Sequence, residues 1–388
     1  MNHAATPTPA GLKQWLLEEL CPFWSARIVD PAGGFFEGLD AQGQALPWTD
    51  RTLLNQARST FTFSLATWLG GDARLRAAAD HGFAFLKQLA TADEQGMAWP
   101  RVMDARGGVL NSSLDAYESS FVILAMAWYH RATGSAEALQ LGDEAYACLV
   151  HRLQDPVHGG FWEEHPFTAK LPRRQNPHMH LLEATLAMHG ATGAPVWLER
   201  ATALVDLFQR AFFDSGSGSL GEYFDAQWRP AAGAEGSLRE PGHQFEWVWL
   251  LQQYIQASGR TELYATVERL FDFGTRFGLN PAGPLQGAAF DEVEQTGEPR
   301  GPSMLMWPQT EYVKACVARF DATGDAVYRD KALAHWALMQ QHFFREDGCN
   351  WINQLGPQGE PLVHHTLSRV LYHVVHSASE LARLETTA

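Results

Sequence analysis

Apolar residues recur at three- and four-residue spacing along most of the chain, which is the pattern of amphipathic helices. The spacing is clear in Phe83, Leu86 and Leu89. It predicts twelve long helices, at residues 10–28, 51–69, 73–92, 115–133, 136–153, 177–191, 196–213, 243–257, 261–278, 304–321, 326–344 and 365–384. The helices come two at a time, with a tight turn such as Ala132-Thr133-Gly134 inside a pair.

Short stretches rich in glycine and aromatic residues separate these pairs, and their composition indicates turns and short strands. They occur at residues 33–38, 96–100, 159–164, 218–223, 287–291 and 348–351. The repeating unit is therefore helix, tight turn, helix and glycine/aromatic loop, with a spacing of about 60 residues.

Six such units predict an all-α fold, in which twelve helices close as two concentric rings. We expect a single (α/α)6 barrel over residues 1–388, because repeats that cannot bury their apolar faces alone are stabilised by their neighbours. An open solenoid of the same repeats is the alternative. The number of units and the Trp-rich loops favour closure, with the loops forming short β-hairpin elements at one mouth.

Composition narrows the function. Hydrophobic residues make up 46% of the chain, and its 14 Trp can pack a core or grip the apolar faces of sugar rings. The formal net charge is −15, and Lys and Arg form no cluster. This charge argues against nucleic acid and anionic membranes as partners, and it disfavours a strongly anionic substrate.

The sequence shows neither a recognisable targeting signal nor a closely spaced pair of cysteines. Residues 1–9 have no basic and apolar leader, and no run of 18 apolar residues follows. Cys21, Cys148, Cys316 and Cys349 are far apart in the sequence. We therefore expect a cytoplasmic protein with reduced thiols.

The stretch Glu240–Trp247 carries the most specific candidate chemistry. Pro241 and Gly242 predict a helix that begins at about His243. His243 and Glu246 then share a face of the first turn, where the carboxylate can orient the imidazole. The helix N-terminus disfavours charge on His243, and a neutral histidine suits proton transfer. A capping region with a partly buried histidine is the alternative interpretation.

Other helices also present polar residues where they begin, after the loops. They are Arg58, Tyr117 and Glu118, His178 and His180, Trp307 and Glu311, and Arg369, Tyr372 and His373. If the loops form the mouth of the barrel, these side chains face one place. Each has a simpler explanation: Arg58 pairs with a helix-end carboxylate, Glu311 caps its own helix, and His373 is a core histidine. Of His178 and His180, only one need point inward.

The sequence motifs give little support for a function that depends on a bound metal or a nucleotide. His178, His180, Glu183 and His243 could supply metal ligands, but HExxH and zinc-finger spacings are missing. The sequence also lacks a glycine-rich phosphate loop and a GxSxG motif. We predict no metal and no cofactor.

The chain resembles the N-acylglucosamine 2-epimerase superfamily over nearly its whole length. The resemblance rests on Gly242–Trp247, on Trp307-Pro308-Gln309-Thr310-Glu311, on Asn55–Arg58 and on Leu371-Tyr372-His373. It implies an (α/α)6 barrel that isomerises or epimerises sugars without a metal. The form Glu-Pro-Gly-His-x-Phe-Glu-Trp is most similar to the aldose–ketose isomerases of the superfamily, which implies conversion of D-mannose to D-fructose.

The resemblance also implies roles. His373 would move the proton at the sugar C2, and His243 would be the second general acid/base, with Glu246 as its partner. The sugar would be held by the side chains of Arg58, His180 and Glu311, walled by Tyr117 and Trp307, with Arg369 nearby on the last helix. The expected partner is a small-molecule monosaccharide, and the expected assembly is a monomer or homodimer.

Four other functions stay open. A 2-epimerase for N-acylglucosamine or mannose would use the same residues. A sulfoquinovose isomerase would need positive charge, which His178, Arg173 and Arg174 could supply. An (α/α)6 glycoside hydrolase would recruit two of Glu118, Glu246 and Glu311. A sugar-binding protein without catalysis is the fourth.

Overall fold

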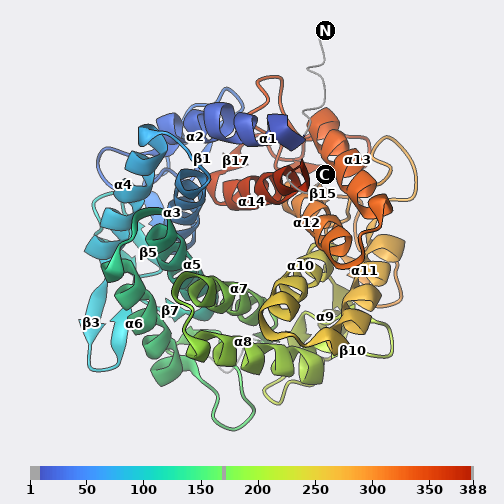
Figure 1. Cartoon of the computed structure of the whole chain (residues 1–388), viewed down its shortest axis with the longest axis horizontal. Helices are drawn as coiled ribbons and strands as arrows, with labels where there is room; N and C mark the ends of the chain where they lie inside the picture. The colour runs from blue at the N-terminus through green and yellow to red at the C-terminus, as the bar shows by residue number, and fades with distance from the viewer. Residues whose placement is uncertain (1–8, 168–171, 386–388) are drawn as a thin grey trace.

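The computed structural model describes residues 9–167 and 172–385, and within these ranges the helices form two concentric rings (Figure 1). The predicted (α/α)6 barrel is confirmed. The inner ring contains α3 (Leu53–Trp68), α5 (Ala116–Thr133), α7 (Asn176–Thr192), α10 (Pro241–Ser258), α12 (Met306–Thr323) and α14 (Leu371–Ala382).

The outer ring alternates with the inner one along the chain. It contains α1 (Pro9–Trp15), η1 (Leu16–Leu20) and α2 (Cys21–Ile28), α4 (Ala73–Leu89), α6 (Ala136–Leu153), α8 (Pro195–Leu207) with η2 (Phe208–Phe212), η3 (Thr261–Leu263) with α11 (Tyr264–Gly278), and α13 (Ala326–His342). The predicted ranges differ from these by a few residues at each end. The largest differences are at residues 365–370, which precede α14, and at residues 90–92, where the chain has already left α4.

Short β-ladders join each unit to the next and close the ring, which excludes the open solenoid. Between successive units they pair β2 (Asp50–Thr52) with β5 (Val102–Asp104), β7 (Leu114–Asp115) with β8 (Glu164–His165), β9 (Arg173–Arg174) with β12 (Tyr223–Phe224), β13 (Leu238–Arg239) with β14 (Val293–Glu294), and β15 (Met304–Leu305) with β16 (Gln354–Leu355). The cycle closes where β1 (Gly38–Leu39) pairs antiparallel with β17 (Thr366–Leu367), Gly38 opposite Leu367.

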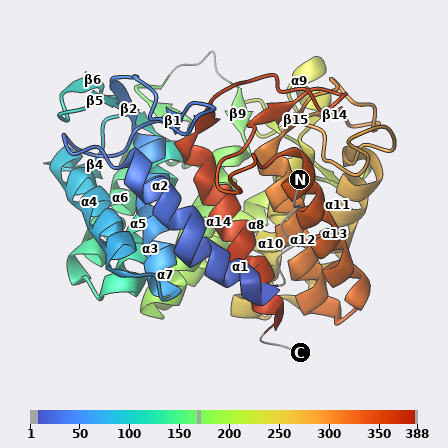
Figure 2. The same cartoon turned by 90° about the horizontal axis from the view of Figure 1, so that it is seen from above.

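The remaining elements decorate the loops. They are the hairpins β3 (Thr91–Asp93) with β4 (Gly96–Ala98) and β10 (Phe213–Asp214) with β11 (Ser219–Leu220), strand β6 (Val109–Asn111), and the short helices α9 (Ala234–Ser237), η4 (Ser368–Val370) and η5 (Arg383–Glu385). Figure 2 shows the strands gathered at one end of the barrel. Every inner helix begins at this end, because the long loop precedes it in each unit.

A repeated side-chain contact fixes these loops to the inner ring. The amide of Gln56 accepts from Phe35 N (2.7 Å) and donates to Phe35 O (3.0 Å). Gln244 makes the same pair of bonds to Leu220, and Gln309 makes it to Ala289. In these three glycine/aromatic stretches, a glutamine of the following helix therefore satisfies the buried backbone. This is why the loops are ordered where the site lies.

Tight turns at the opposite end reverse the chain between the rings. Gly134 and Gly324 end α5 and α12 at φ 77° and 69°, a left-handed conformation that glycine adopts without a Cβ clash. The side chains of Ser135 and Asp325 then cap the following helices. The four cysteines are buried and free, and none of the described helices is long and apolar enough to cross a membrane.

Candidate active site

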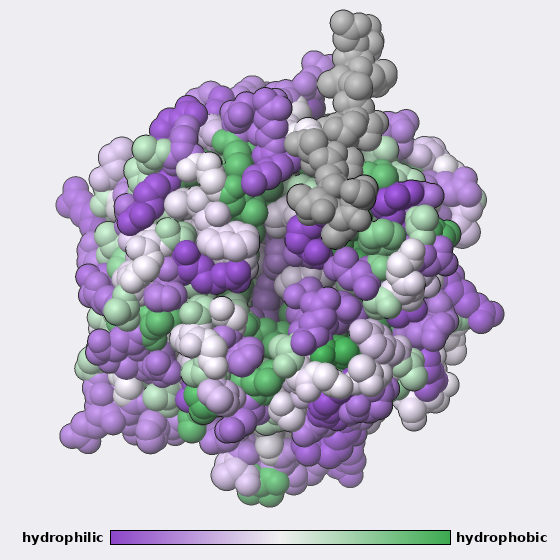
Figure 3. All heavy atoms as spheres, viewed as in Figure 1, coloured by the Kyte–Doolittle hydropathy of each residue, from purple (hydrophilic) through white to green (hydrophobic). Residues whose placement is uncertain are grey.

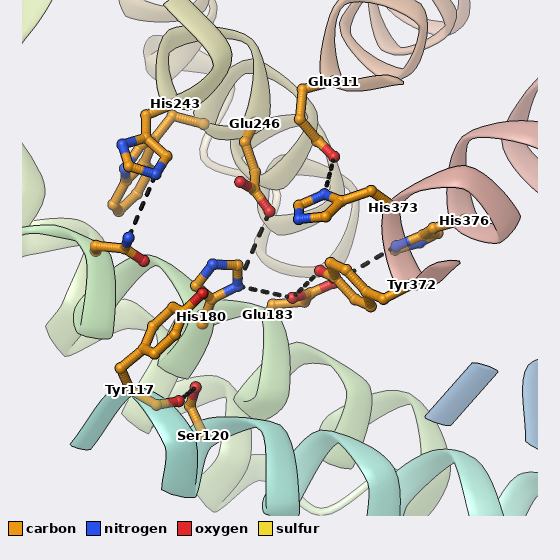
Figure 4. Close-up of polar contacts among 12 residues, drawn as sticks. Tyr117, Ser120, His180, Glu183, His243, Glu246, Glu311, Tyr372, His373 and His376 are labelled. Atoms are coloured by element: carbon orange, nitrogen blue, oxygen red, sulfur yellow. Dashed lines mark hydrogen bonds and ion pairs between the residues drawn. The ribbon is translucent and has the colours of Figure 1, made fainter. Parts of the chain in front are cut away.

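Polar side chains from the inner helices converge at the loop-bearing end of the barrel (Figure 4). The groups shown come from α5 (Tyr117), α7 (His180, Glu183), α10 (His243, Glu246), α12 (Glu311) and α14 (Tyr372, His373). Each lies in the first turns of its helix, and all but the half-buried Tyr117 are buried. The loop-to-helix order of the repeat therefore brings five distant segments to one place.

His373 sits at the centre of a hydrogen-bonded chain. Its Nδ1 lies 2.8 Å from Glu311 Oε1, and Lys314 Nζ lies 2.8 Å from Glu311 Oε2. Because a carboxylate only accepts, Nδ1 carries the proton, and Nε2 presents its lone pair. Arg58 Nη1 lies 3.5 Å from that Nε2. The imidazole is thus held in one tautomer with its basic nitrogen beside a cation.

The charge states follow from burial and pairing. Burial lowers the pKa of His373 to about 3, although the bond to Glu311 opposes the shift, so the ring is neutral at pH 7. Burial would raise the pKa of Glu311, but Lys314 and then His373 hold it well below its usual range. Glu311 is therefore an ionised acceptor, and it does not cap its own helix.

His243 has different partners from those predicted. Its Nδ1 donates to Glu222 Oε2 at 2.9 Å and lies 3.4 Å from Glu240 Oε2. Burial would lower the pKa of His243, but the carboxylates of Glu240 and Glu222 outweigh it and raise the pKa to about 10. The prediction of a neutral His243 is wrong, because two nearby carboxylates exceed the effect of the helix N-terminus.

Glu246 is not the hydrogen-bond partner of His243, which corrects a second prediction. Both of its carboxyl oxygens are buried and have no hydrogen-bond partner among the described residues. Its Oε1 lies 3.9 Å from His180 Nδ1, which itself lies 3.2 Å from Glu183 Oε2. Burial, followed by Glu311, raises the pKa of Glu246 well above its usual value. Burial therefore favours the protonated form of Glu246, which can donate to a ligand.

Trp307 lies between the two histidines. Its ring centroid is 5.1 Å from that of His243 and 5.6 Å from that of His373. A Cβ at position 242 would come within 2.4 Å of the indole, so Gly242 is the residue that lets Trp307 pack there. The glycine of the Pro-Gly-His motif therefore makes room for the indole between the histidines.

Arg58 is a further cation of the site, in addition to Lys314 and His243. It forms no ion pair within the described ranges; instead Nη2 donates to Tyr117 Oη (2.8 Å), and the guanidinium lies 4.1 Å over Phe121. Arg369 contributes its backbone carbonyl, which accepts from Arg58 Nη1 at 3.4 Å. The structure thus brings Arg58, Tyr117, His180, Trp307 and Glu311 together, with Arg369 at the edge.

The loop before α7 does not supply the positive charge proposed for a sulfonate. Arg173 pairs with Asp155 and Arg174 with Glu163, both at 2.7 Å. His178 bonds the backbone, with Nε2 accepting from Phe161 N, and burial lowers its pKa to about 3. These groups are neutralised within the protein, so only His180 of the histidine pair reaches the site.

The sequence analysis missed Glu222 and Lys314. Glu222 lies in a glycine/aromatic loop, and nothing local marks it as a partner of a histidine on α10. Lys314 carried a signal, since a lysine three residues after Glu311 on an apolar helix shares its face. Gln175 also orients Glu222, by donating to its Oε2 at 2.9 Å.

Among the residues that the structure describes, three groups have potential metal-ligating atoms within 4.8 Å of one another: His180 with Glu183 and Glu246, Glu222 with Glu240 and His243, and Glu246 with Glu311 and His373. In the last group the ammonium of Lys314 already neutralises Glu311. In the second, His243 Nδ1 is engaged by Glu222. The metal-free chemistry expected from the sequence stays a prediction, which a chelator tests below.

The site thus combines a neutral and a charged histidine at one mouth of a closed (α/α)6 barrel. Residues 34–377 match the family model of N-acylglucosamine 2-epimerase. A mannose-6-phosphate isomerase of Rhizobium meliloti (strain 1021) is 32% identical over 83% of this chain and 82% of its own length.

Two further comparisons cover nearly the whole chain. A D-mannose isomerase of Thermobifida fusca is 27% identical over 96% of this chain and 97% of its own. The crystal structure of a D-mannose isomerase matches with a TM-score of 0.88 at 24% identity, over 99% of this chain and 100% of that one. The chain belongs to the N-acylglucosamine 2-epimerase family.

Proposed function

We propose that this protein isomerises a free aldose to its ketose, D-mannose to D-fructose. The observation that carries the proposal is the pair of histidines on either side of Trp307, one with a lowered pKa and neutral, the other with a raised pKa and positively charged. Where the surroundings of two titratable groups shift their pKa values in opposite directions, one group can act as the acid and the other as the base. The names of the mannose isomerases among the relatives agree with this substrate.

Each histidine has a distinct task. Protonated His243 delivers a proton to the ring oxygen while the anomeric hydroxyl loses one, which opens the pyranose. His373 Nε2 then removes the proton from C2, and the electron pair forms an enediolate whose oxygen charge Arg58 stabilises. Return of the proton to C1, with transfer of the hydroxyl proton from O2 to O1, yields the ketose without change of composition.

A free sugar fits this site better than a phosphorylated one. Glu222 and Glu240 lie against His243 in the cluster, and Arg173 and Arg174 are already paired. Carboxylates repel a phosphate dianion in a low-dielectric site. This preference distinguishes the proposal from the activity named for the Rhizobium meliloti relative.

We expect EDTA-treated protein to convert D-mannose to D-fructose at an unchanged rate. In D2O, deuterium should enter C1 of the product. Deuterium only at C2 with glucose as product would show 2-epimerisation, and activity restored only by a divalent metal would refute the metal-free mechanism. Preferential turnover of mannose 6-phosphate would refute the free-sugar substrate.

The pH profile tests the charged histidine. His243 stays protonated up to its raised pKa of about 10, so the acid form is lost only as pH rises through that value. Glu222→Gln removes one of the carboxylates responsible, and the alkaline limb of kcat/KM should move down by about 1 to 3 pH units. Glu262→Gln, on the exposed outer ring, should leave the profile unchanged. An unmoved limb in Glu222→Gln would show that His243 is not the acid.

A further inference from the structure

We propose a second saccharide site at the end of the barrel opposite the catalytic cluster, one that takes a neutral, ring-closed sugar. A cavity of about 490 Å³ lies among the second halves of the inner helices. Figure 3 views the barrel from this end and shows the hollow at its centre. The volume is in the usual range for small-molecule pockets, which is about 300 to 1,000 Å³.

Indole rings form the walls of this distal cavity. Trp68, Trp128 and Trp249 all line it, from three different inner helices. Arg131 lies 4.1 Å over the Trp128 ring and 4.7 Å over the Trp68 ring. The apolar face of a pyranose stacks on such rings, while its hydroxyls need donors and acceptors around the edge.

The polar groups of the cavity fit hydroxyls better than an anion. Arg383 is already paired with Asp321 (2.9 Å) and Glu380 (2.7 Å). Arg131 forms no ion pair with any described residue, so its donors are available, but Glu183 also lines the cavity and balances its charge. Gln253 and Gln256 add amide groups. The carboxylates of the cavity therefore balance its arginines, and the cavity does not attract a phosphate or carboxylate ligand.

His376 marks the inner end of the distal cavity. It is 5% exposed, its ring lies 4.7 Å from that of Trp249, and its buried Nδ1 makes no hydrogen bond to a described residue. Nδ1 is 3.6 Å from Glu183 Oε1. A buried imidazole without a hydrogen bond is costly unless a ligand supplies one.

Glu183 separates this cavity from the catalytic cluster. Its carboxylate accepts from Tyr372 Oη at 2.6 Å and lies 3.2 Å from His180 Nδ1. A sugar in the distal cavity would thus meet the far side of the Glu183 network and would not reach His373. The site is independent of which sugar reaction the mouth performs.

The experiment uses full-length protein labelled with 5-fluorotryptophan and the probe methyl α-D-mannopyranoside, which is neutral and cannot open its ring. Resonances are assigned with single Trp→Phe variants. We expect the ¹⁹F signals of Trp68, Trp128 and Trp249 to shift with one shared Kd. Trp336, buried in the outer ring against Trp15, should not shift.

Arg131→Gln should weaken the Kd reported by Trp249 about tenfold, the usual effect of losing a charged hydrogen bond. Arg131→Gln should leave any titration seen at Trp307 unchanged. Arg329→Gln on the outer surface should alter neither the Kd reported by Trp249 nor the titration at Trp307. Shifts confined to Trp307, no shift at all, or an Arg131→Gln Kd equal to that of the parent would overturn the site. Tighter binding of mannose 6-phosphate at Trp128 would overturn the neutral ligand.

Discussion

We expect His373→Ala to lower kcat for mannose isomerisation at least ~10²-fold, a usual contribution of a general acid or base. The loss should be nearly complete, because the lone pair of His373 Nε2, which lies beside Arg58, is the one positioned to accept the C2 proton. Exchange of the substrate C2 hydrogen with D2O should disappear as well. His243→Ala should lower kcat to a similar extent but recover exchange with a sugar that cannot cyclise.

His335 supplies the matched control for this experiment. It is also a buried histidine whose pKa burial lowers to about 3, but it lies on α13 and bonds Gln309 Oε1 at 3.2 Å. His335→Ala should reduce thermal stability and leave kcat unchanged. If His373→Ala behaves like His335→Ala, His373 is a core histidine. The losses from His243 and His373 should not add, since both serve one proton path.

Lys314→Met should lower the free energy of unfolding by about 3 to 5 kcal/mol, the usual cost of breaking a buried ion pair. Lys314 and Glu311 are both 0% exposed, with 2.8 Å between Nζ and Oε2. Lys314 also faces the carboxyl groups of Glu246 and Glu183, which support its charged form. Denaturant unfolding measures the loss, and Lys331→Met on the exposed face of α13 should change stability by less than about 0.5 kcal/mol.

A second substitution distinguishes charge from packing at this pair. Adding Glu311→Gln removes the stranded carboxylate, so Lys314→Met with Glu311→Gln should recover most of the lost stability. Activity should stay low. His373 becomes positively charged when it accepts the C2 proton, and an amide at position 311 stabilises that charge less than a carboxylate does. A double variant as unstable as Lys314→Met alone would show that the lysine stem, and not its charge, stabilises the helix.

The positions of the helices and the residues at their starts could be predicted from local sequence. Apolar spacing and the Ala-Thr-Gly turns are short-range signals, so α5, α6, α12 and α13 lie close to their predicted ranges. The unit order then places Arg58, His180 and His373 at one end. The ladder between β1 and β17, which closes the ring, joins residues over 300 positions apart and has no local signature.

The chain by itself determined that six helix starts deliver histidines, carboxylates and two arginines to a common end, because periodicity and turn chemistry depend on neighbouring residues. Only the tertiary structure decided their charges. The pKa of His243 is raised by Glu240 and by Glu222, which reaches the ring from another loop, and burial near Glu311 and Glu183 raises the pKa of Glu246. Coulomb energy and desolvation depend on distance through space and on burial, and neither quantity is written in the spacing of residues along the chain.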